Sequence, residues 1–279
     1  MVFVQIEQKV GYRWYLWAFQ SATAIAFVLD PSRSHRVPDG HFQGVAGGIL
    51  LVDRYSGYKA MDLVKDGTIL LAFCWAHVRR DFVGLGKSWP QLAGWALEWL
   101  LEIRALYHLN RQRLRSRPDA AAFAEHDRAL RDAVAAMAAK REEQLGRKDL
   151  HPACRKTLES LSEHWEGLTL FVDHPDVPMD NNRTERTQRG PVVGRKNYYG
   201  SVALWSGKLA AILFSLFATL KLYGINPRHW LTAYLEACAA AGGKPPENAA
   251  DFLPWNMSEE IKAAMRAPFL GAVPVNDSS

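Results

Sequence analysis

The stretch Gly47-Gly48-Ile49-Leu50-Leu51-Val52-Asp53 decides the fold class of this 279-residue chain. Two glycines lead into four consecutive apolar residues, and the run ends at a carboxylate. An unbroken apolar run of this kind indicates a strand buried on both faces, as in parallel sheets. A short helix is predicted over about residues 57–64, and a second apolar strand follows over residues 68–74. We therefore expect a β-α-β unit at this point of the chain.

Three more strands are predicted upstream, in runs rich in aromatic and β-branched residues: residues 2–6, 12–19 and 23–29. Gly11 and the pair Gln20-Ser21 separate them as turn residues. Three antiparallel strands followed by parallel ones form a mixed sheet, which needs helices on its faces. The predicted fold class is therefore α/β, with a mixed sheet flanked by helices.

The middle of the chain is predicted to be helical. Trp95, Trp99, Ile103 and Leu106 follow helical spacing over four turns, and Pro118 ends that helix. A second helix carries Leu130, Val134 and Met137, and a third covers about residues 152–166. The final third returns to mixed structure, with a short helix stopped by Gly190-Pro191, a buried helix over about residues 204–222 and another from Pro227. The expected organisation is a first sheet part at 1–83, a helical insertion at 84–167, the remainder of the sheet domain at 168–240 and a loosely packed tail at 241–279.

Composition limits the possible functions. The net charge of +5 and the isoelectric point near 9.1 permit a polyanionic partner without requiring one. Three widely spaced cysteines exclude a disulfide scaffold. The longest apolar stretch, residues 209–222, is shorter than the roughly 20 residues of a membrane span. We expect a soluble, cytoplasmic protein with no membrane contact.

Two carboxylates have notable positions. Asp53 follows a rigid strand at the edge where α/β sheets place their sites; alternatively, it caps the next helix or pairs with Arg54. Glu185 lies in the unusual segment formed by residues 179–189. If that segment is one helix, Asn181, Asn182, Glu185 and Arg189 share a face. The alternative is an exposed, capped helix with Glu185 paired to Arg189.

Basic residues cluster in three places. Within 14 residues that hold one acid, five residues are basic: Arg183, Arg186, Arg189, Arg195 and Lys196. Tyr198, Tyr199 and Gly200 follow them. Basic side chains beside aromatic ones favour a nucleic-acid backbone as the partner. Arg79-Arg80 is a second cluster. A third ends the first long helix, where a solvated face is the preferred interpretation: Arg111, Arg113, Arg115 and Arg117. Cys74 and His77 are too few ligands for zinc, and His77 is expected to face the same edge as Asp53.

Five blocks together resemble transposases of the insertion sequence 66 family of bacterial mobile elements. They occur in family order and spacing within residues 1–236: Val52-Asp53-Arg54-Tyr55-Ser56-Gly57-Tyr58, Ala72-Phe73-Cys74-Trp75-Ala76-His77-Val78-Arg79-Arg80-Asp81-Phe82, Asp180-Asn181-Asn182-Arg183-Thr184-Glu185-Arg186, Gly194-Arg195-Lys196-Asn197 and Gly224-Ile225-Asn226-Pro227.

The resemblance implies an RNase H-like catalytic domain of the DDE type, with the helical insertion between the second and third acids. Asp53 matches the second acid and Glu185 the third; both would hold a two-metal Mg²⁺ or Mn²⁺ site. His77 and Asn182 are auxiliary candidates. The DNA-binding candidates are Arg79, Arg80, Arg186, Arg189, Arg195 and Lys196. The implied partners are the element ends and target DNA, bound by a homo-oligomer.

This chain departs from the family at its beginning. The first acid of the family, in an Asp-Glu-Thr block, is expected just before Met1, and the nearest acid present is Glu7. We therefore expect a transposase catalytic domain that is truncated and poorly active. Two alternatives remain: an inactive DNA-binding remnant, and an RNase H-like nuclease that cuts without strand transfer.

Overall fold

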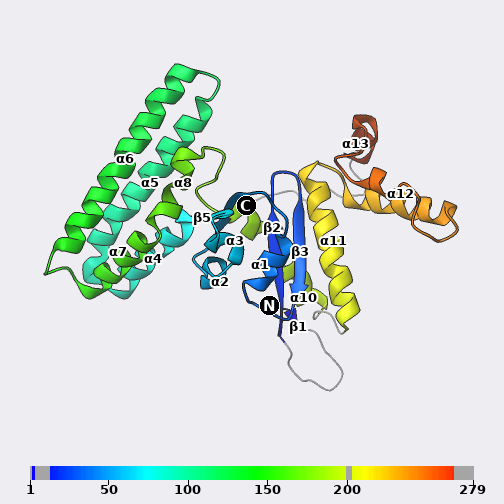
Figure 1. Cartoon of the computed structure of the whole chain (residues 1–279), viewed down its shortest axis with the longest axis horizontal. Coiled ribbons are helices and arrows are strands. Elements are labelled where there is room, and N and C mark those ends of the chain that lie inside the picture. Colours follow the sequence, from blue (N-terminus) through cyan, green and yellow to red (C-terminus); the bar gives the residue numbers. More distant parts are fainter. Residues whose placement is uncertain (1, 4–12, 199–202, 267–279) are drawn as a thin grey trace, which may run out of the picture. The chain divides into compact units, whose positions relative to one another are not determined.

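The computed structural model describes residues 2–3, 13–198 and 203–266 (Figure 1). The strands are β1 (Val2–Phe3), β2 (Arg13–Gln20), β3 (Ile25–Asp30), β4 (Gly48–Val52) and β5 (Ile69–Phe73). The helices up to the middle of the chain are α1 (Arg36–His41), α2 (Ser56–Lys59), α3 (Asp62–Lys65), α4 (Trp75–Ser88), η1 (Pro90–Leu92), α5 (Ala93–Arg115) and α6 (Ala120–Gly146). The remaining helices are α7 (Pro152–Glu163), α8 (Trp165–Asp173), α9 (Asn182–Thr187), α10 (Arg189–Tyr198), α11 (Leu204–Leu222), α12 (Pro227–Ala240), η2 (Ala249–Phe252) and α13 (Glu259–Arg266).

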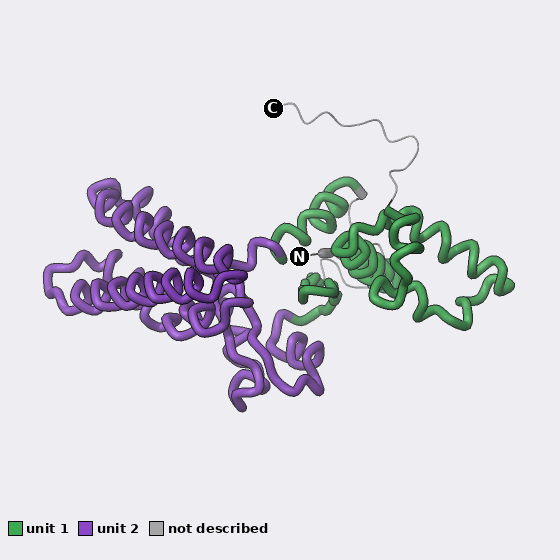
Figure 2. The backbone as a smooth tube through the Cα atoms, turned by 90° about the horizontal axis from the view of Figure 1, so that it is seen from above, with its two compact units in different colours: residues 1–32, 184–279 green, residues 33–183 purple. Residues whose placement is uncertain are grey.

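The chain forms two compact units, residues 33–183 and residues 1–32 with 184–279 (Figure 2). The first unit contains a two-stranded parallel sheet. β4 and β5 pair from Gly48 opposite Ile69 to Val52 opposite Phe73. Two one-turn helices, α2 and α3, connect these strands where the sequence predicts one helix. The predicted β-α-β unit is therefore present, and both strands have their carboxyl ends at one edge of the sheet.

Helices α4 to α8 pack into a bundle in the same unit (Figure 1). The apolar stripe predicted on α5 faces its core, where Trp99 is 0% exposed and Ile103 and Leu106 are 1% exposed. These side chains pack with residues of β4, β5 and the other helices: Val52, Phe73, Trp75, Val78, Phe82, Leu130, Met137, Leu158, Leu161, Leu168, Phe171, Val172 and Met179. Residues 84–167 are thus mainly helical, as their periodicity predicts.

Helix α8 lies directly on β5, and Gly167 allows this close approach. A Cβ atom at Gly167 would lie 2.4 Å from the main-chain oxygen of Leu71 and 2.5 Å from Cδ2 of Phe73. The sequence places the end of a third helix near residue 166. In the structure α7 ends at Glu163 and α8 continues to Asp173, so that prediction is wrong.

We expect Gly167→Ala to lower the free energy of unfolding by about 1–3 kcal/mol, because the added methyl group must displace main chain or the Phe73 ring. Gly84→Ala in α4 is the matched control, since nothing lies within 4 Å of its added Cβ. That control should gain up to ~1 kcal/mol from alanine's helix propensity. Urea unfolding followed by circular dichroism measures both. Equal effects at the two positions would contradict the close approach of α8 to β5.

The second unit contains the antiparallel sheet β1-β2-β3, with α11 along β3 (Figure 1). Two hydroxyl groups of α11 bond to the outer edge of β3. The Ser215 hydroxyl accepts from the Phe27 N–H at 2.8 Å. The Thr219 hydroxyl accepts from the Ile25 N–H at 3.0 Å and donates to the Ile25 carbonyl at 3.1 Å. These hydroxyls take the place of a neighbouring strand in the hydrogen-bonding ladder.

Helix α11 is only partly buried, which corrects the expectation of a buried helix. Ala211 and Phe214 pack against β3, whereas Trp205, Leu209 and Ile212 are 71%, 46% and 57% exposed. With 19 residues and a mean hydropathy of 1.3, α11 is the one helix in the described part of the chain long and apolar enough to cross a membrane. Core helices of soluble proteins meet the same length and hydropathy criteria but are mostly buried, whereas 22% of this apolar stretch is buried.

The region after α12 is more ordered than the sequence predicts. Met257 is 6% exposed and packs in one cluster with Ile225 and Trp230. The Asn226 N–H donates to the Met265 carbonyl of α13 at 3.0 Å. The prediction of a loosely packed tail is therefore wrong up to Arg266, and residues 267–279 lie outside the described residues.

The strands in the described part of the chain form two separate sheets, one in each unit, and not the single mixed sheet expected. The α/β class itself agrees with the structure, which combines short sheets with many helices. The unit boundaries near residues 32 and 183 also differ from the predicted limits at 83, 167 and 240. β4, β5 and the helical segment share one unit.

Candidate functional site

Asp53 follows the last residue of β4 and is half-buried. Its Oδ1 accepts a hydrogen bond from the Tyr55 N–H at 3.0 Å, which turns the chain into α2. Arg54, the alternative partner considered above, pairs with Asp81 instead. Burial and then the charge of Asp53 raise the pKa of Tyr58 to about 12. Asp53 therefore lies at the carboxyl edge of the sheet as predicted, without an ion pair to Arg54.

The end of β5 lies beside Asp53. The Cys74 N–H donates to the Val52 carbonyl at 3.1 Å, so the residues that follow β4 and β5 start from adjacent positions. Cys74 is fully buried, and burial raises the pKa of its thiol. His77 lies in the first turn of α4, half-buried, with Nε2 3.0 Å from Nη2 of Arg80. Both belong to the same sheet edge by chain position.

A segment distant in sequence returns to this edge. The Met179 carbonyl accepts from the Trp75 N–H at 2.9 Å, and the Asn181 N–H lies 3.5 Å from Sγ of Cys74. These contacts bring Asp180 to the carboxyl ends of β4 and β5. Cys74 and Asn181 belong to two of the sequence blocks that carry the family resemblance. The structure brings these two residues into contact.

Asp180 is held by both of its carboxylate oxygens. Oδ1 accepts from the Asn182 N–H at 3.1 Å, at the start of α9, and Oδ2 accepts from the Tyr107 hydroxyl at 3.0 Å. Burial, followed by the charge of Asp180 and the hydrogen bond to it, raises the pKa of Tyr107. The Tyr107 phenol therefore remains protonated near neutral pH, as a donor must.

Glu185 lies on α9 and is exposed. Asn181 precedes this helix, and Arg189 begins the next one, α10, so the condition for a shared face from Asn181 to Arg189, one continuous helix, is not met. Gly190 lies in the first turn of α10 and does not stop a helix. Asp53 belongs to the unit 33–183, and Glu185 to the other unit. Their convergence on one site remains a prediction.

The candidate DNA-binding side chains lie on three helices. Arg79 and Arg80 are exposed on α4, Arg186 lies in the last turn of α9, and Arg189 starts α10. Arg195 and Lys196 lie in the last turn of α10, where cations are favoured by the helix dipole. Asn182 is the first residue of α9 and half-buried. Tyr199 and Gly200 lie outside the described residues.

Oxygen ligands suited to Mg²⁺ or Mn²⁺ are present at the sheet edge. Asp53 supplies a carboxylate, and Oδ1 of Asn181 is buried without a hydrogen-bond donor in the described structure. A buried amide oxygen that lacks a donor is destabilising unless another group satisfies it. Carboxylate and amide oxygens are the ligands that these cations prefer, so the residues present fit the implied metal.

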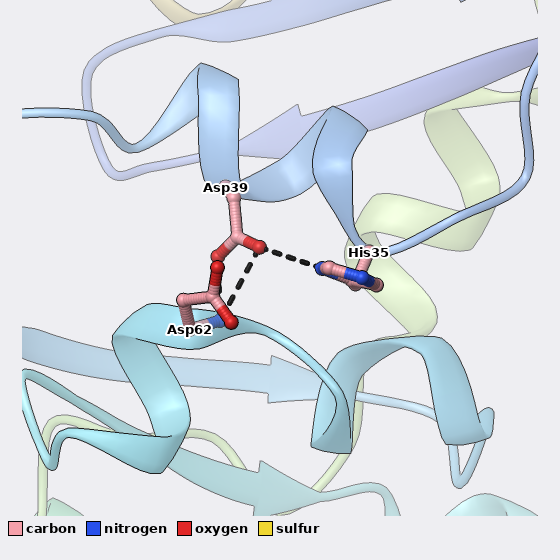
Figure 3. A group of neighbouring side chains, drawn as sticks. All are labelled: His35, Asp39 and Asp62. Atoms are coloured by element: carbon pink, nitrogen blue, oxygen red, sulfur yellow. Dashed lines mark hydrogen bonds and ion pairs between the residues drawn. The ribbon is translucent and has the colours of Figure 1, made fainter.

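A second group of potential ligands lies at α1 and α3. The ligand atoms of His35, Asp39 and Asp62 lie within 4.8 Å of one another (Figure 3). The Asp39 carboxylate accepts the Asp62 N–H at 3.1 Å and contacts Nδ1 of His35 at 2.9 Å. Burial opposes ionisation, but these hydrogen bonds outweigh it and lower the pKa of Asp39. The group therefore connects α1 to the start of α3, a structural role.

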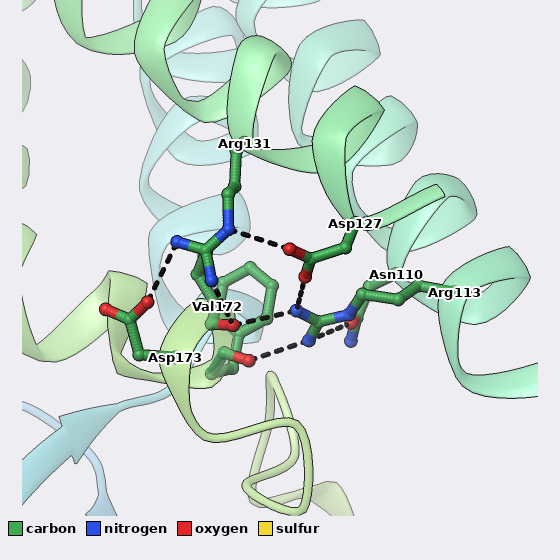
Figure 4. A network of polar contacts seen from close by, with 7 residues as sticks. Asn110, Arg113, Asp127, Arg131, Val172 and Asp173 are labelled. Atoms are coloured by element: carbon green, nitrogen blue, oxygen red, sulfur yellow. Dashed lines mark hydrogen bonds and ion pairs between the residues drawn. The ribbon is translucent and has the colours of Figure 1, made fainter. Parts of the chain in front are cut away.

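Sequence reasoning missed a buried polar network around Arg113 (Figure 4). Arg113 is 0% exposed, which corrects the solvated face expected for the basic end of α5. Its guanidinium donates to the carbonyls of Phe171 and Val172 at 2.7 and 2.8 Å, in the last turn of α8. It also donates to Asn110 and Asp127, both at 2.8 Å. The network joins α5, α6 and α8.

The fold and the site define an α/β protein that gathers oxygen ligands at the carboxyl edge of a parallel strand pair. Comparison with protein families identifies its kind. The family described as "Transposase IS66 family" matches residues 3–209, a range that includes Asp53 and Glu185. The chain belongs to this family.

The relatives found come from Sinorhizobium fredii (strain NBRC 101917 / NGR234). "Uncharacterized protein y4jD" is 30% identical over 250 residues, which is 86% of this chain and 47% of the relative. "Uncharacterized protein y4hP" is 27% identical over 256 residues, 87% of this chain and 45% of the relative. The chain thus spans about half the length of these relatives. No solved structure matches it significantly.

Proposed function

We propose that this chain is the catalytic part of a transposase, which cleaves and transfers DNA strands with Mg²⁺ or Mn²⁺. The observation that carries the proposal is the family match over residues 3–209, which contains both candidate carboxylates. The position of Asp53 at the carboxyl edge of β4 supports it. The fold we propose is RNase H-like, with the helices between Asp53 and Glu185 as an insertion.

Each residue has a distinct role in this proposal. Asp53 and Glu185 hold the divalent cations, which supply activation of the attacking oxygen and neutralisation of the leaving oxygen when bound. Asp53 is presented by the strand end and by its bond to the Tyr55 N–H. Asn182 and His77 assist as polar neighbours of these carboxylates. The buried Cys74 thiol has a raised pKa and takes no part.

The basic side chains are proposed to hold DNA through its phosphates, which positions the duplex without reading its sequence. They are the six exposed or half-exposed residues Arg79, Arg80, Arg186, Arg189, Arg195 and Lys196. We further propose a homo-oligomer on DNA within the bacterial cytoplasm.

Metal binding in the presence of DNA tests this function. Mg²⁺-type sites use one or two carboxylates plus substrate phosphates, so binding of Mn²⁺ should be strongest with a DNA duplex present. We expect Asp53→Ala or Glu185→Ala to weaken Mn²⁺ binding by at least the ~10–100-fold typical of lost outer-shell partners. Electron paramagnetic resonance counts the free Mn²⁺, and nicking of supercoiled plasmid with Mn²⁺ is the parallel activity readout.

Two exposed acids on described helices are matched controls. Asp132→Ala on α6 removes a carboxylate from the same unit as Asp53, and Glu260→Ala on α13 does so in the unit of Glu185. Both should keep wild-type Mn²⁺ affinity. Unchanged Mn²⁺ binding in the Asp53 and Glu185 variants would refute the metal site. Nicking without joining of DNA ends would favour the nuclease alternative.

A further inference from the structure

The segment before Glu185 is fixed by several unrelated elements. Met179 is 5% exposed, and its carbonyl accepts from the Trp75 N–H at the start of α4. The Asn181 N–H lies 3.5 Å from Sγ of Cys74, at the end of β5. The Tyr107 hydroxyl, from α5, reaches Oδ2 of Asp180 at 3.0 Å. This segment is therefore an ordered part of the sheet edge.

Asp180 connects this anchored segment to α9. Its Oδ1 accepts from the Asn182 N–H at 3.1 Å, two residues on, which is an Asx turn that leads into the first residue of α9. Glu185 is the fourth residue of α9 and lies in its first turn. The Asp180 carboxylate therefore fixes the first residue of α9, the helix that carries Glu185.

Tyr107 determines that orientation from the helical bundle. Its ring packs against the main core, and its phenol is half-buried. Burial and the neighbouring charge of Asp180 raise its pKa, so the proton stays on the phenol oxygen. A hydrogen bond from a neutral donor to a carboxylate in such surroundings is stronger than one in water.

We propose that Tyr107 is a positioning residue of the candidate site: its hydroxyl orients Asp180, and Asp180 sets the start of the helix that carries Glu185. The inference rests on the proposed function, because Glu185 matters only if it holds a cation. Through Tyr107 on α5, the helical bundle then contributes to the candidate site. Asp180 acts here through the Asn182 N–H, which donates to its Oδ1.

Tyr107→Phe tests the proposal by removing only the hydroxyl group. We expect amide hydrogen exchange in the peptide covering residues 175–187 to accelerate by about tenfold or more, which corresponds to the loss of one hydrogen bond to a charged acceptor. Exchange within residues 130–137 of α6 should not change. Mn²⁺ affinity with DNA present should fall severalfold. Asp180→Asn should act in the same direction, and the double variant should be no worse than the worse single variant.

Tyr234→Phe on α12 is the matched control, and it should behave as wild type in both measurements. Unchanged exchange at residues 175–187 in Tyr107→Phe would overturn the inference, as would equal acceleration in α6, which indicates general destabilisation. Faster exchange with unchanged Mn²⁺ affinity would also overturn it, because Tyr107 would then be merely structural. If Asp53→Ala and Glu185→Ala leave Mn²⁺ binding unchanged, it is the proposed function that fails.

Discussion

Arg113→Ala is expected to lower the free energy of unfolding by about 3–5 kcal/mol, the usual cost of removing one member of a buried ionic network. The substitution removes a donor from the Phe171 carbonyl and from the Asn110 side chain. It leaves the Val172 carbonyl only the longer bond from Arg131, at 3.4 Å. Each buried polar group that loses its partner costs roughly 1–3 kcal/mol. The last turn of α8 also loses the cation that satisfies its carbonyl ends.

Urea unfolding of the variant measures this loss, and the same helix supplies the controls. Arg111 and Arg115 are exposed on α5, so their alanine variants should stay within about 0.5 kcal/mol of wild type. The loss of unfolding free energy in Arg113→Lys should lie between that of Arg113→Ala and that of the two controls, since one ammonium group cannot reach four acceptors in fixed directions. A loss in Arg113→Ala as small as in the two controls would contradict the network.

The network also predicts how this loss depends on pH. Burial of Asp127 opposes ionisation, but hydrogen bonds from Arg131 and Arg113 outweigh it and lower the pKa of Asp127 below its ordinary value of 3.8. A lowered carboxyl pKa contributes stability that is present above the unfolded-state pKa and is lost as the pH falls through the folded-state pKa. The difference in the free energy of unfolding between wild type and Arg113→Ala should therefore become smaller below about pH 4.

Trp99→Ala should also lower the free energy of unfolding by about 3–5 kcal/mol, because a large, fully buried ring leaves a cavity that the core refills only in part. Trp99 is 0% exposed, and its ring stacks on Phe82 with centroids 5.5 Å apart. Its indole N–H donates to Gln144 at 3.1 Å, and the Lys140 ammonium lies 5.0 Å from the ring centroid.

Two further variants serve as comparisons for Trp99→Ala. Leu101 on the same helix is 52% exposed, so Leu101→Ala should change the free energy of unfolding by less than about 0.5 kcal/mol. Trp99→Phe keeps most of the apolar volume, and Gln144 retains a donor in Trp95, so the loss should be well below that of alanine. A loss below about 1 kcal/mol for Trp99→Ala would contradict the packing of α5 on α4 and α6.

The strands and long helices follow from local patterns, and the sequence predicts them well. The apolar run before Asp53 predicts β4, and the spacing of Trp99, Ile103 and Leu106 predicts the buried face of α5. That spacing of four and three residues continues to Asn110 and then Arg113. The apolar spacing therefore indicates a buried position at Arg113, whereas its charge indicates an exposed one, and in the structure the spacing holds.

Other features depend on contacts between distant residues, which no local pattern contains. The Tyr107 hydroxyl meets Asp180 across 73 residues of sequence, and in the sequence Tyr107 reads only as one more apolar position of α5. The order of residues 249–266 depends likewise on packing, since Phe252, Met257 and Met265 contact Trp230 and its neighbours in one cluster. Whether Asp53 and Glu185 meet remains a prediction, since each belongs to a different unit.

The hydroxyl groups that α11 places along β3 have a consequence for assembly. A strand whose outward amides and carbonyls are satisfied offers no template for another strand, so the Ser215 and Thr219 contacts close that side of the antiparallel sheet. A further strand, from this chain or from a second molecule, therefore cannot pair with β3 at Ile25 and Phe27. An apolar helix with two well-placed hydroxyls thus protects the protein against edge-to-edge aggregation while it contributes to the core.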